Sequence, residues 1–211
     1  ITIVVPCFNE EAHIDKLTDI LISQCDRLNS NYEILFVDDG STDNSFDEIK
    51  AKNKYNNKIK LIKLSKNYGS HIAISAGIEN SIESDLIIVC PLDDVKNENL
   101  FAKMISKYQE GNEIVWTVRK TRNKNFILKF LTKIYYKIFI TLTGFKNYPE
   151  NGTSAIFLIT KKIANEFIKF KESNIVINVL LYSIGFDQGH VEYNENKDIR
   201  KSSYSFFKRF K

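Results

Sequence analysis

Cysteine, proline, methionine and tryptophan are all scarce in this chain of 211 residues, which has only three, three, one and one of them. Because Cys7, Cys25 and Cys90 lie far apart and form no Cys-x-x-Cys pair, a disulfide framework and a thiolate metal site are both disfavoured, and a reducing compartment is favoured. The three histidines are equally scattered, so we expect them to be structural. No apolar run approaches the roughly 20 residues that a membrane span requires.

The remaining composition is that of a globular protein. Hydrophobic residues make up 43% of the chain, which is long enough for one domain with a full core. The charge is uneven: residues 1–118 carry 12 Lys and Arg against 19 Asp and Glu, and residues 119–211 carry 18 against 7. This asymmetry favours a cation or nucleotide in the first half and an anionic partner in the second, although a solvated lysine-rich surface is the plainer alternative.

Strand and helix patterns alternate through the first half, which predicts an α/β fold with a mostly parallel sheet and helices on both faces. We expect a single domain over residues 1–211, with the second half completing the first. The expected strands are 1–5, 32–37, 59–64, 86–90, 113–118, 154–160 and, at an edge, 188–195. The expected helices are 12–28, 43–52, 70–80, 98–110, 125–143, 161–171 and 175–183.

Two apolar runs rich in β-branched residues end abruptly in polar loops, the second of them at Asp38 and Asp39. Ligands bind outside the carboxyl ends of the strands in an open α/β sheet, and a carboxylate there accepts hydrogen bonds from a nucleobase or from ribose hydroxyls. An ordinary turn with an N-cap is the alternative, and it accounts for Gly40, Ser41 and Asp43 without a ligand. The predicted nucleotide-binding residues of this pair of loops are Pro6, Phe8, Asn9, Glu10, Asp38 and Asp39.

Four further segments follow in register, and with the two loops they resemble the family 2 glycosyltransferases over essentially the whole chain. The segments are 64–77, with Lys66 and Asn67; the strand that ends at Arg119; the Gly185-Phe186 turn; and 200–204, with Arg200 and Ser202. The last two are similar to one branch of the family, the polyprenyl-phosphate glycosyltransferases.

The resemblance implies the GT-A fold of nucleotide-diphospho-sugar transferases and a transfer that inverts the anomeric carbon. The donor would be a nucleotide-sugar and the acceptor a polyprenyl phosphate at the cytoplasmic face of the membrane. Lys66 and Asn67 would join the nucleotide site. Asp93, Arg119 and Arg200 would act in catalysis, and the acceptor phosphate would meet Arg200, Ser202, Thr153 and Ser154.

Departures from the family pattern affect the metal and the base. Where the family has Asp-x-Asp to hold Mg²⁺ or Mn²⁺, this chain has Pro91 and Asp93, with Asp94 as an extra neighbour. Asp93 and Asp94 remain candidate ligands, because Mg²⁺ takes one or two carboxylates together with phosphates and waters. Where the family places an acid near the acceptor, Thr153 and Ser154 stand instead. A hydroxyl is a poor base, but a lipid phosphate is already an anion and needs little deprotonation.

The expected helix 125–143 carries lysines at steps of four or five residues among aromatic and aliphatic side chains. Such a helix is typical of one that lies in a membrane surface, and a core helix with a lysine edge is the alternative. The predicted membrane-surface residues are Lys129, Lys133, Lys137, Phe130 and Phe139. The chain stops in a basic aromatic stretch, so we expect the natural protein to continue past residue 211, and the domain to be peripheral or anchored by that continuation.

Two other functions stay open. One is a glycosyltransferase that acts on a saccharide acceptor in surface-polysaccharide assembly, and the other is a degenerate, non-catalytic domain that binds a lipid or a partner. A nucleic-acid partner is disfavoured because the basic half lacks any recognition motif. The sequence names neither the sugar nor the base.

Overall fold

The computed structural model describes residues 1–92, 99–119, 126–145, 149, 153–170 and 177–193, and for residues 119 and 126–133 it describes the backbone alone. The strands of this part are β1 (Thr2–Cys7), β2 (Glu33–Asp38), β3 (Ile59–Lys63), β4 (Leu86–Val89), β5 (Ile114–Arg119), β6 (Phe157–Thr160) and β7 (Gln188–Tyr193). The helices are α1 (Ile14–Asp26), α2 (Ser45–Tyr55), α3 (Ser70–Glu79), α4 (Leu100–Gln109), α5 (Phe126–Thr143), α6 (Lys161–Phe167) and α7 (Ile177–Ser183).

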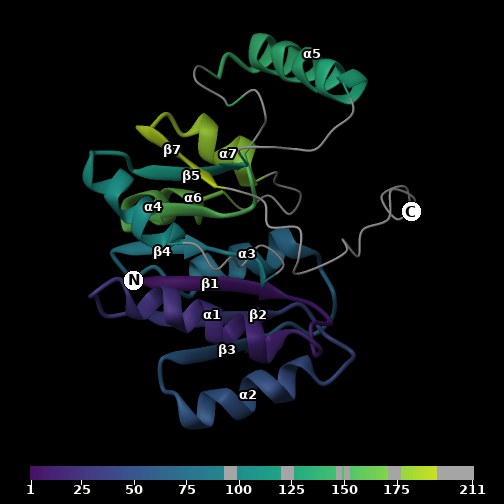
Figure 1. The fold of residues 1–211 in the computed structure, drawn as a ribbon, viewed down its shortest axis with the longest axis vertical. Helices are drawn as coiled ribbons and strands as arrows, with labels where there is room; N and C mark the ends of the chain where they lie inside the picture. The colour runs from purple at the N-terminus through teal and green to yellow at the C-terminus, as the bar shows by residue number, and fades with distance from the viewer. Residues whose placement is uncertain (93–98, 120–125, 146–148, 150–152, 171–176, 194–211) are drawn as a thin grey trace.

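One sheet of seven strands runs through the described residues in the order β3-β2-β1-β4-β6-β5-β7 (Figure 1). β1 pairs in parallel with β2 and β4, β2 with β3, and β5 with β7. β6 is antiparallel to both of its neighbours, β4 and β5. The sheet is therefore mostly parallel, and β7 lies at an edge; both predictions are confirmed.

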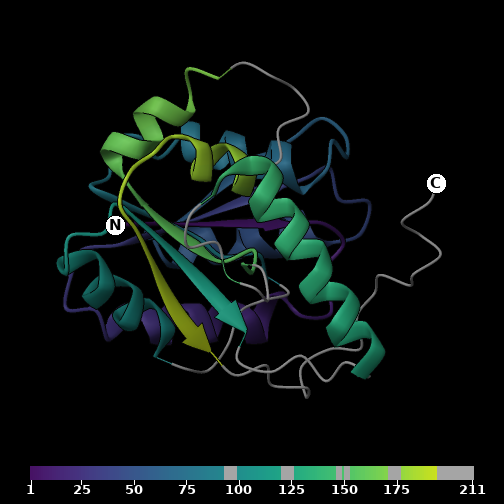
Figure 2. The same ribbon diagram turned by 90° about the horizontal axis from the view of Figure 1, so that it is seen from above.

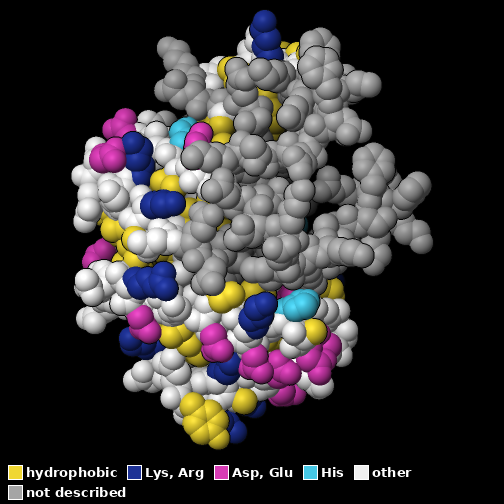
Figure 3. Space-filling view, viewed as in Figure 1, with side chains coloured by type: hydrophobic (Ala, Val, Ile, Leu, Met, Phe, Trp, Pro, Cys, Tyr) yellow, Lys and Arg dark blue, Asp and Glu magenta, His cyan; other side chains and the backbone are white. Residues whose placement is uncertain are grey.

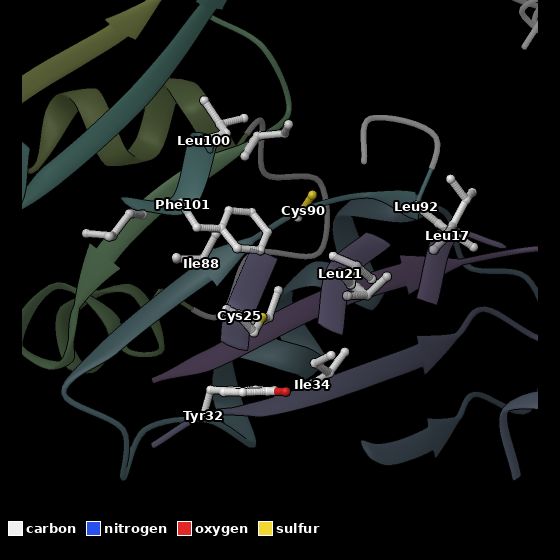
Figure 4. Packing of buried hydrophobic residues seen from close by; sticks show 14 of the residues in the cluster. Leu17, Leu21, Cys25, Tyr32, Ile34, Ile88, Cys90, Leu92, Leu100 and Phe101 are labelled. Atoms are coloured by element: carbon white, nitrogen blue, oxygen red, sulfur yellow. The ribbon is translucent and has the colours of Figure 1, made fainter. Parts of the chain in front are cut away.

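The central strands are buried on both faces, which explains why they read as continuous apolar runs rather than as alternating ones. Ile3 and Val5 of β1 belong to a cluster with α1 and α4, whereas Val4 faces a second cluster with α3, α6 and α7. Figure 4 shows the first cluster, in which Leu17 and Leu21 of α1 lie over the sheet. Helices thus cover both faces, as expected from the sequence.

The second half of the chain departs furthest from the expected element ends. β6 begins at Phe157, three residues later than expected, because the Ser154 hydroxyl accepts a hydrogen bond from the backbone N–H of Ile156 and forms a local turn before the strand. α6 ends at Phe167, short of the expected residue 171. Elsewhere the described ends lie within three residues of the expected ones.

α5 is the expected long helix, and it stands apart from the sheet (Figures 1 and 2). It ends at Thr143, and the next residue, Gly144, has a φ of 69° and donates its backbone N–H to the Ile140 carbonyl at 2.9 Å. A left-handed glycine is the usual end of a helix. Among the helices that the structure describes, none combines the length and the hydropathy that crossing a membrane requires.

Candidate functional site

The sheet topology brings most of the predicted site segments to one edge. β1, β2 and β4 run in the same direction, so their carboxyl ends meet there. β6 is antiparallel to β4 and β5 is antiparallel to β6, so β5 and its parallel neighbour β7 also end at this edge, where β6 begins. The edge therefore collects the loops after β1, β2 and β3, the end of β5 at Arg119, and the turn that precedes β6.

The loops after β1 and β2 interlock through reciprocal hydrogen bonds. The Asn9 backbone N–H donates to the Ser41 hydroxyl at 2.9 Å, and the Asn9 amide oxygen accepts from the Thr42 backbone N–H at 2.9 Å. The Glu10 backbone N–H donates to the Ser45 hydroxyl at 2.7 Å. Asn9 adopts a φ of 53°, a left-handed conformation that asparagine tolerates better than most residues. The polar residues of both loops therefore fix the position of one loop against the other.

A second reciprocal pair of hydrogen bonds links the same two loops. Glu11 donates its backbone N–H to the Asp43 carboxylate at 3.2 Å, and its own carboxylate accepts from the Asn44 side-chain amide at 2.7 Å. Burial works to raise the pKa of Asp43, but hydrogen bonds from Ser45 and Glu11 outweigh it, so the pKa lies below its usual range. Asp43 thus stays ionised and holds the start of α2. Acidic side chains gather on the lower right of the face in Figure 3, near these loops.

Asp39 holds a third loop, the one before α3. Its carboxylate accepts hydrogen bonds from the backbone N–H groups of Tyr68 at 2.8 Å and Gly69 at 2.9 Å, and the residue is 3% exposed. Gly40 follows it with a φ of 70°, and a Cβ there would lie 2.4 Å from the backbone of Lys66. The loop that carries Lys66 and Asn67 is therefore packed directly on the loop after β2.

Asp38 is fully buried, yet one of its oxygens is not used by the described protein atoms. Oδ1 accepts from the Ser41 backbone N–H at 3.1 Å, whereas Oδ2 has no hydrogen-bond partner among the described residues. Burial raises the pKa of the neighbouring Cys7 thiol, and the Asp38 carboxylate adds to that increase. An unmatched buried carboxylate oxygen is costly, so this oxygen would gain from a donor group that comes within its reach.

The predicted nucleotide-binding residues therefore fall into two groups. Pro6, Glu10, Asp38 and Asp39 are buried and build the framework. The side chains at the surface of the same loops are Phe8, Asn9, Lys66 and Asn67. Phe8 is 39% exposed, which is unusual for a large aromatic residue and offers an apolar surface at the edge of the sheet.

The turn before β6 contains both hydroxyls predicted to meet the acceptor, but it places them in different environments. Ser154 is 7% exposed. Its hydroxyl is hydrogen-bonded to the Thr117 hydroxyl and accepts from the backbone N–H of Ile156. Thr153 is only half-buried, and its hydroxyl oxygen accepts a hydrogen bond from the Asn178 side-chain amide at 2.9 Å. Asn178, on α7, was not found from the sequence, because a single asparagine in a short apolar helix belongs to no motif.

The described end of α5 presents an apolar surface that the sheet does not cover. Ile134, Tyr135, Ile138 and Leu142 are 41%, 61%, 53% and 80% exposed, and Lys137 is exposed beside them. A helix in the core of the described residues would bury such side chains, so this side of α5 is not part of that core.

Aromatic rings connect the end of α5 to the sheet. Phe139 of α5 meets the edge of Phe145 at 5.9 Å, and Phe145 stacks on Tyr182 of α7 at 5.7 Å. Tyr182 in turn stacks on the buried Trp116 of β5 at 5.0 Å, with 12° between the ring planes. Among the predicted membrane-surface residues, Lys137 and Phe139 are the two whose side chains the structure describes.

Other predicted residues remain without a described environment. Asp93 and Asp94, as well as Arg200 and Ser202, lie outside the described residues, and the side chains of Arg119, Lys129, Lys133 and Phe130 are not described. Within the part of the chain that the structure covers, no three His, Cys, Asp or Glu side chains form a group able to hold a metal ion. The predicted cation site therefore still depends on Asp93 and Asp94.

Comparisons with known proteins agree with this arrangement. The sequence profile of "Glycosyl transferase family 2" matches residues 2–177. YkcC, an uncharacterized glycosyltransferase of Bacillus subtilis, is 33% identical over 91% of this chain and 59% of its own length. The undecaprenyl-phosphate 4-deoxy-4-formamido-L-arabinose transferase of Proteus mirabilis is 28% identical over 99% of the chain and 64% of its own length. The chain thus spans roughly three-fifths of the length of these relatives.

A solved structure supports the fold itself. The mannosyltransferase PcManGT of Pyrobaculum calidifontis, in complex with GDP-Man and Mn²⁺, superposes with a TM-score of 0.66. The superposition covers 93% of this chain and 57% of that one at 13% identity. At this identity the likeness concerns the fold alone, and it confirms the expected GT-A architecture.

Proposed function

Because the chain belongs to glycosyl transferase family 2, we propose that its protein transfers a sugar from a nucleotide-sugar to a polyprenyl phosphate, with inversion at the anomeric carbon. The observation that carries the donor half of this proposal is the set of interlocked loops at the carboxyl edge. They surround a buried Asp38 carboxylate whose Oδ2 has no partner among the described residues. Loops fixed before the ligand arrives lose little conformational freedom on binding, so they suit a donor site.

The proposed reaction is a single displacement. An oxygen of the acceptor phosphate attacks the anomeric carbon, the new bond forms as the bond to the β-phosphate oxygen breaks, and the nucleoside diphosphate leaves with the electron pair. The acceptor is already ionised, so no side chain has to remove a proton. Arg119 and Arg200 would stabilise the charge that develops on the leaving diphosphate.

A divalent cation is the proposed cofactor, with Asp93 and Asp94 as its ligands. It would neutralise charge on the diphosphate. Since the family's first ligand position is Pro91 here, we expect the cation to bind weakly without nucleotide and to rely on phosphate oxygens for much of its coordination.

The choice of a lipid acceptor is supported by α5. Its described end exposes Ile138 and Leu142 next to Lys137, a combination that suits the interface of an anionic membrane. The name of the Proteus mirabilis relative, which includes undecaprenyl phosphate, points the same way. The corresponding location is the cytoplasmic face of the membrane, where the helix would rest on the lipid and the acceptor chain would stay in the bilayer.

The deciding experiment is a screen of nucleotide-sugars for hydrolysis and for transfer to farnesyl phosphate, a short polyprenyl phosphate, with and without Mn²⁺. We expect one donor to be hydrolysed slowly without an acceptor, and to be consumed faster, by transfer of its sugar, when farnesyl phosphate is present. Asp38→Asn keeps the shape of the side chain and should weaken binding of that donor by about 1–3 kcal/mol, because a bound donor group loses its carboxylate acceptor.

Three results would count against the proposal. Unchanged donor affinity in both Asp38→Ala and Asp39→Ala would exclude the loops as the donor site. Transfer to a saccharide but not to farnesyl phosphate would favour the saccharide-acceptor alternative. Absence of donor binding under every condition would favour a non-catalytic domain.

A further inference from the structure

We infer that Asn178 is a positioning residue that orients the Thr153 hydroxyl to donate a hydrogen bond to the phosphate of an anionic acceptor. The inference rests on the proposed function, and it names a residue of α7 that neither the sequence motifs nor the comparisons single out. Thr153 and Asn178 are 25 residues apart in the chain, and the fold brings them together at the carboxyl edge of β5.

The direction of one hydrogen bond carries the argument. The Asn178 Nδ2 group can only donate, so the Thr153 Oγ1 atom is the acceptor of the 2.9 Å bond between them. A threonine hydroxyl has a single proton, and among the described residues no acceptor takes the proton of Thr153, so it can donate to a ligand. Accepting a hydrogen bond also polarises the hydroxyl and makes it a stronger donor.

The neighbouring hydroxyl cannot do the same task. Ser154 is 7% exposed, and its side chain is engaged with Thr117 and with the backbone N–H of Ile156. It shapes the turn that leads into β6. Of the two hydroxyls in this turn, Thr153 is therefore the one whose partly exposed side chain has a proton to offer.

α7 is a firm support for the Asn178 amide. Ile177 and Leu181 are buried, and Tyr182 is held between the rings of Trp116 and Phe145. The Tyr182 hydroxyl is also 2.8 Å from the Nε2 atom of His190. Asn178 and Tyr182 are four residues apart, so they lie on the same side of the helix, and the aromatic contacts that fix one also fix the other.

The chemistry of the pair selects the class of acceptor. A hydroxyl that accepts from an amide and donates to a ligand suits a phosphate oxygen, whereas it cannot remove a proton from a sugar hydroxyl. The second half of the chain, residues 119–211, carries 18 Lys and Arg against 7 Asp and Glu, which also favours an anion there. The shared ligand chemistry is an ionised phosphate group, either free or at the end of a prenyl chain.

The test uses the full chain, the donor chosen by the screen, and three probes: farnesyl phosphate, inorganic phosphate and farnesol. We expect Thr153→Val and Asn178→Asp each to raise the KM and the Kd of farnesyl phosphate about tenfold or more. The introduced carboxylate of Asn178→Asp would accept the Thr153 proton and repel the anion. Thr153→Ser should restore the KM to within about threefold, and in Asn178→Asp the donor KM should change less than the KM of farnesyl phosphate.

A double-mutant cycle separates positioning from a general effect on α7. Asn178→Ala should raise the KM of farnesyl phosphate in the wild-type background but add nothing in the Thr153→Val background, because its effect passes through that hydroxyl. Asn80→Ala is the matched control: it removes an asparagine amide that donates to a helix carbonyl at the end of α3. Competition by inorganic phosphate without competition by farnesol would identify the phosphate, not the prenyl chain, as the group recognised.

Failure of the inference differs from failure of the proposed function. An unchanged KM in Asn178→Asp, an Asn178→Ala effect that persists in Thr153→Val, or an equal loss of donor hydrolysis would each overturn the role of Asn178. If no nucleotide-sugar is turned over, the Kd of farnesyl phosphate measured by calorimetry still decides. A wild-type chain that binds neither farnesyl phosphate nor inorganic phosphate would overturn the inference outright.

Discussion

Two regions of this molecule are organised in opposite ways. The loops after β1, β2 and β3 are held by side-chain hydrogen bonds to backbone N–H groups, as Asp39 holds Tyr68 and Gly69. The described end of α5 is held by ring contacts, and Ile138 and Leu142 on its surface remain largely exposed. In the first region, polar side chains form hydrogen bonds within the chain. In the second, apolar side chains are exposed.

The contrast suggests different relations to their ligands. If these loops form the donor site, the residues that fix them, such as Asp39, should affect stability and binding together. An exposed apolar face adds little to the stability of the folded chain, because burial is what stabilises apolar groups. Residues of α5 should therefore affect association with a membrane more than they affect folding. The predictions below test this difference, beginning with the largest effect.

The first prediction compares two glycines with the same backbone conformation. Gly40→Ala should lower the free energy of unfolding by about 2–5 kcal/mol, because φ is 70° and the new Cβ would lie 2.4 Å from the Lys66 backbone. Gly144→Ala, at the end of α5, has a φ of 69° but nothing within 4 Å of the new Cβ, so it should cost only about 1–2 kcal/mol. Urea denaturation measures both. Equal losses would mean that the loops after β2 and β3 are no more tightly packed than the end of α5.

The second prediction concerns the exposed face of α5. Leu142→Asp should weaken binding to anionic vesicles about tenfold or more, because it replaces an apolar contact with a negative charge, while the free energy of unfolding changes by less than about 0.5 kcal/mol. Tyr55→Asp is the matched control, since Tyr55 is 91% exposed but lies at the end of α2 in the other half. Co-sedimentation gives the affinity. If both variants bind vesicles equally well, α5 is not the membrane-contacting element.

The third prediction concerns Asp39 in the donor loops. Asp39→Asn should destabilise the chain by about 1–3 kcal/mol, because the amide can accept from only one of the two backbone N–H groups that the carboxylate now satisfies. The nucleotide affinity should fall with it. Asp38→Asn should affect affinity more than stability, since its Oδ2 atom has no partner among the described residues. Chemical denaturation and calorimetry on the same samples separate the two effects, and the reverse ranking would contradict this division of labour.

Most of the fold was predictable from the sequence because its strands are buried on both faces and its turns follow them closely. The apolar runs 1–5 and 32–37 predict buried strands, and the structure places β1 and β2 there. The start of β6 was not predictable, because Ser154 makes a local turn that interrupts an otherwise apolar, strand-like run. Local hydrogen bonds of this kind compete with the sheet without any change in hydrophobic pattern.

The segments that form the candidate site were predictable from the sequence, but the contacts between their atoms were not. Motif order identified the loops of Asp38, Asp39 and Lys66, and the parallel sheet then puts their strands' ends at one edge. Which of the two aspartates holds a loop, and which has an oxygen without a partner among the described residues, depends on distances to Tyr68 and Gly69 that no motif encodes. The contact between Thr153 and Asn178 likewise depends on how α7 packs on β5.

The fourth prediction uses the only tryptophan of the chain as a reporter of the other region. Phe145→Ala removes the ring between Phe139 of α5 and Tyr182, and should cost about 1–2 kcal/mol because two aromatic contacts are lost. Trp116 stacks on Tyr182, so its emission should change in this variant. Phe46→Ala, which removes a half-buried ring from α2, is the control that should leave the emission unchanged. An unchanged Trp116 signal in Phe145→Ala would show that the rings do not connect α5 to the sheet.

The smallest expected effect concerns pH, and it again belongs to the region around α7. Burial lowers the pKa of His190 below its ordinary value of 6.5, and the nearby Lys107 lowers it further. The unfolded chain therefore binds more protons than the folded chain as the pH falls below about 6.5. The contribution of neutral, buried His190 to the free energy of unfolding is thus present above that pH and is lost progressively below it. His190→Gln should reduce the fall in unfolding free energy between pH 7.5 and 5.5, as followed by urea denaturation with Trp116 fluorescence. Tyr182→Phe keeps the ring stack and the burial of His190 but removes the hydroxyl, so its pH dependence should match that of the wild type. If Tyr182→Phe flattens the curve as much as His190→Gln does, then the hydrogen bond between the two residues, rather than burial, sets the protonation of the histidine.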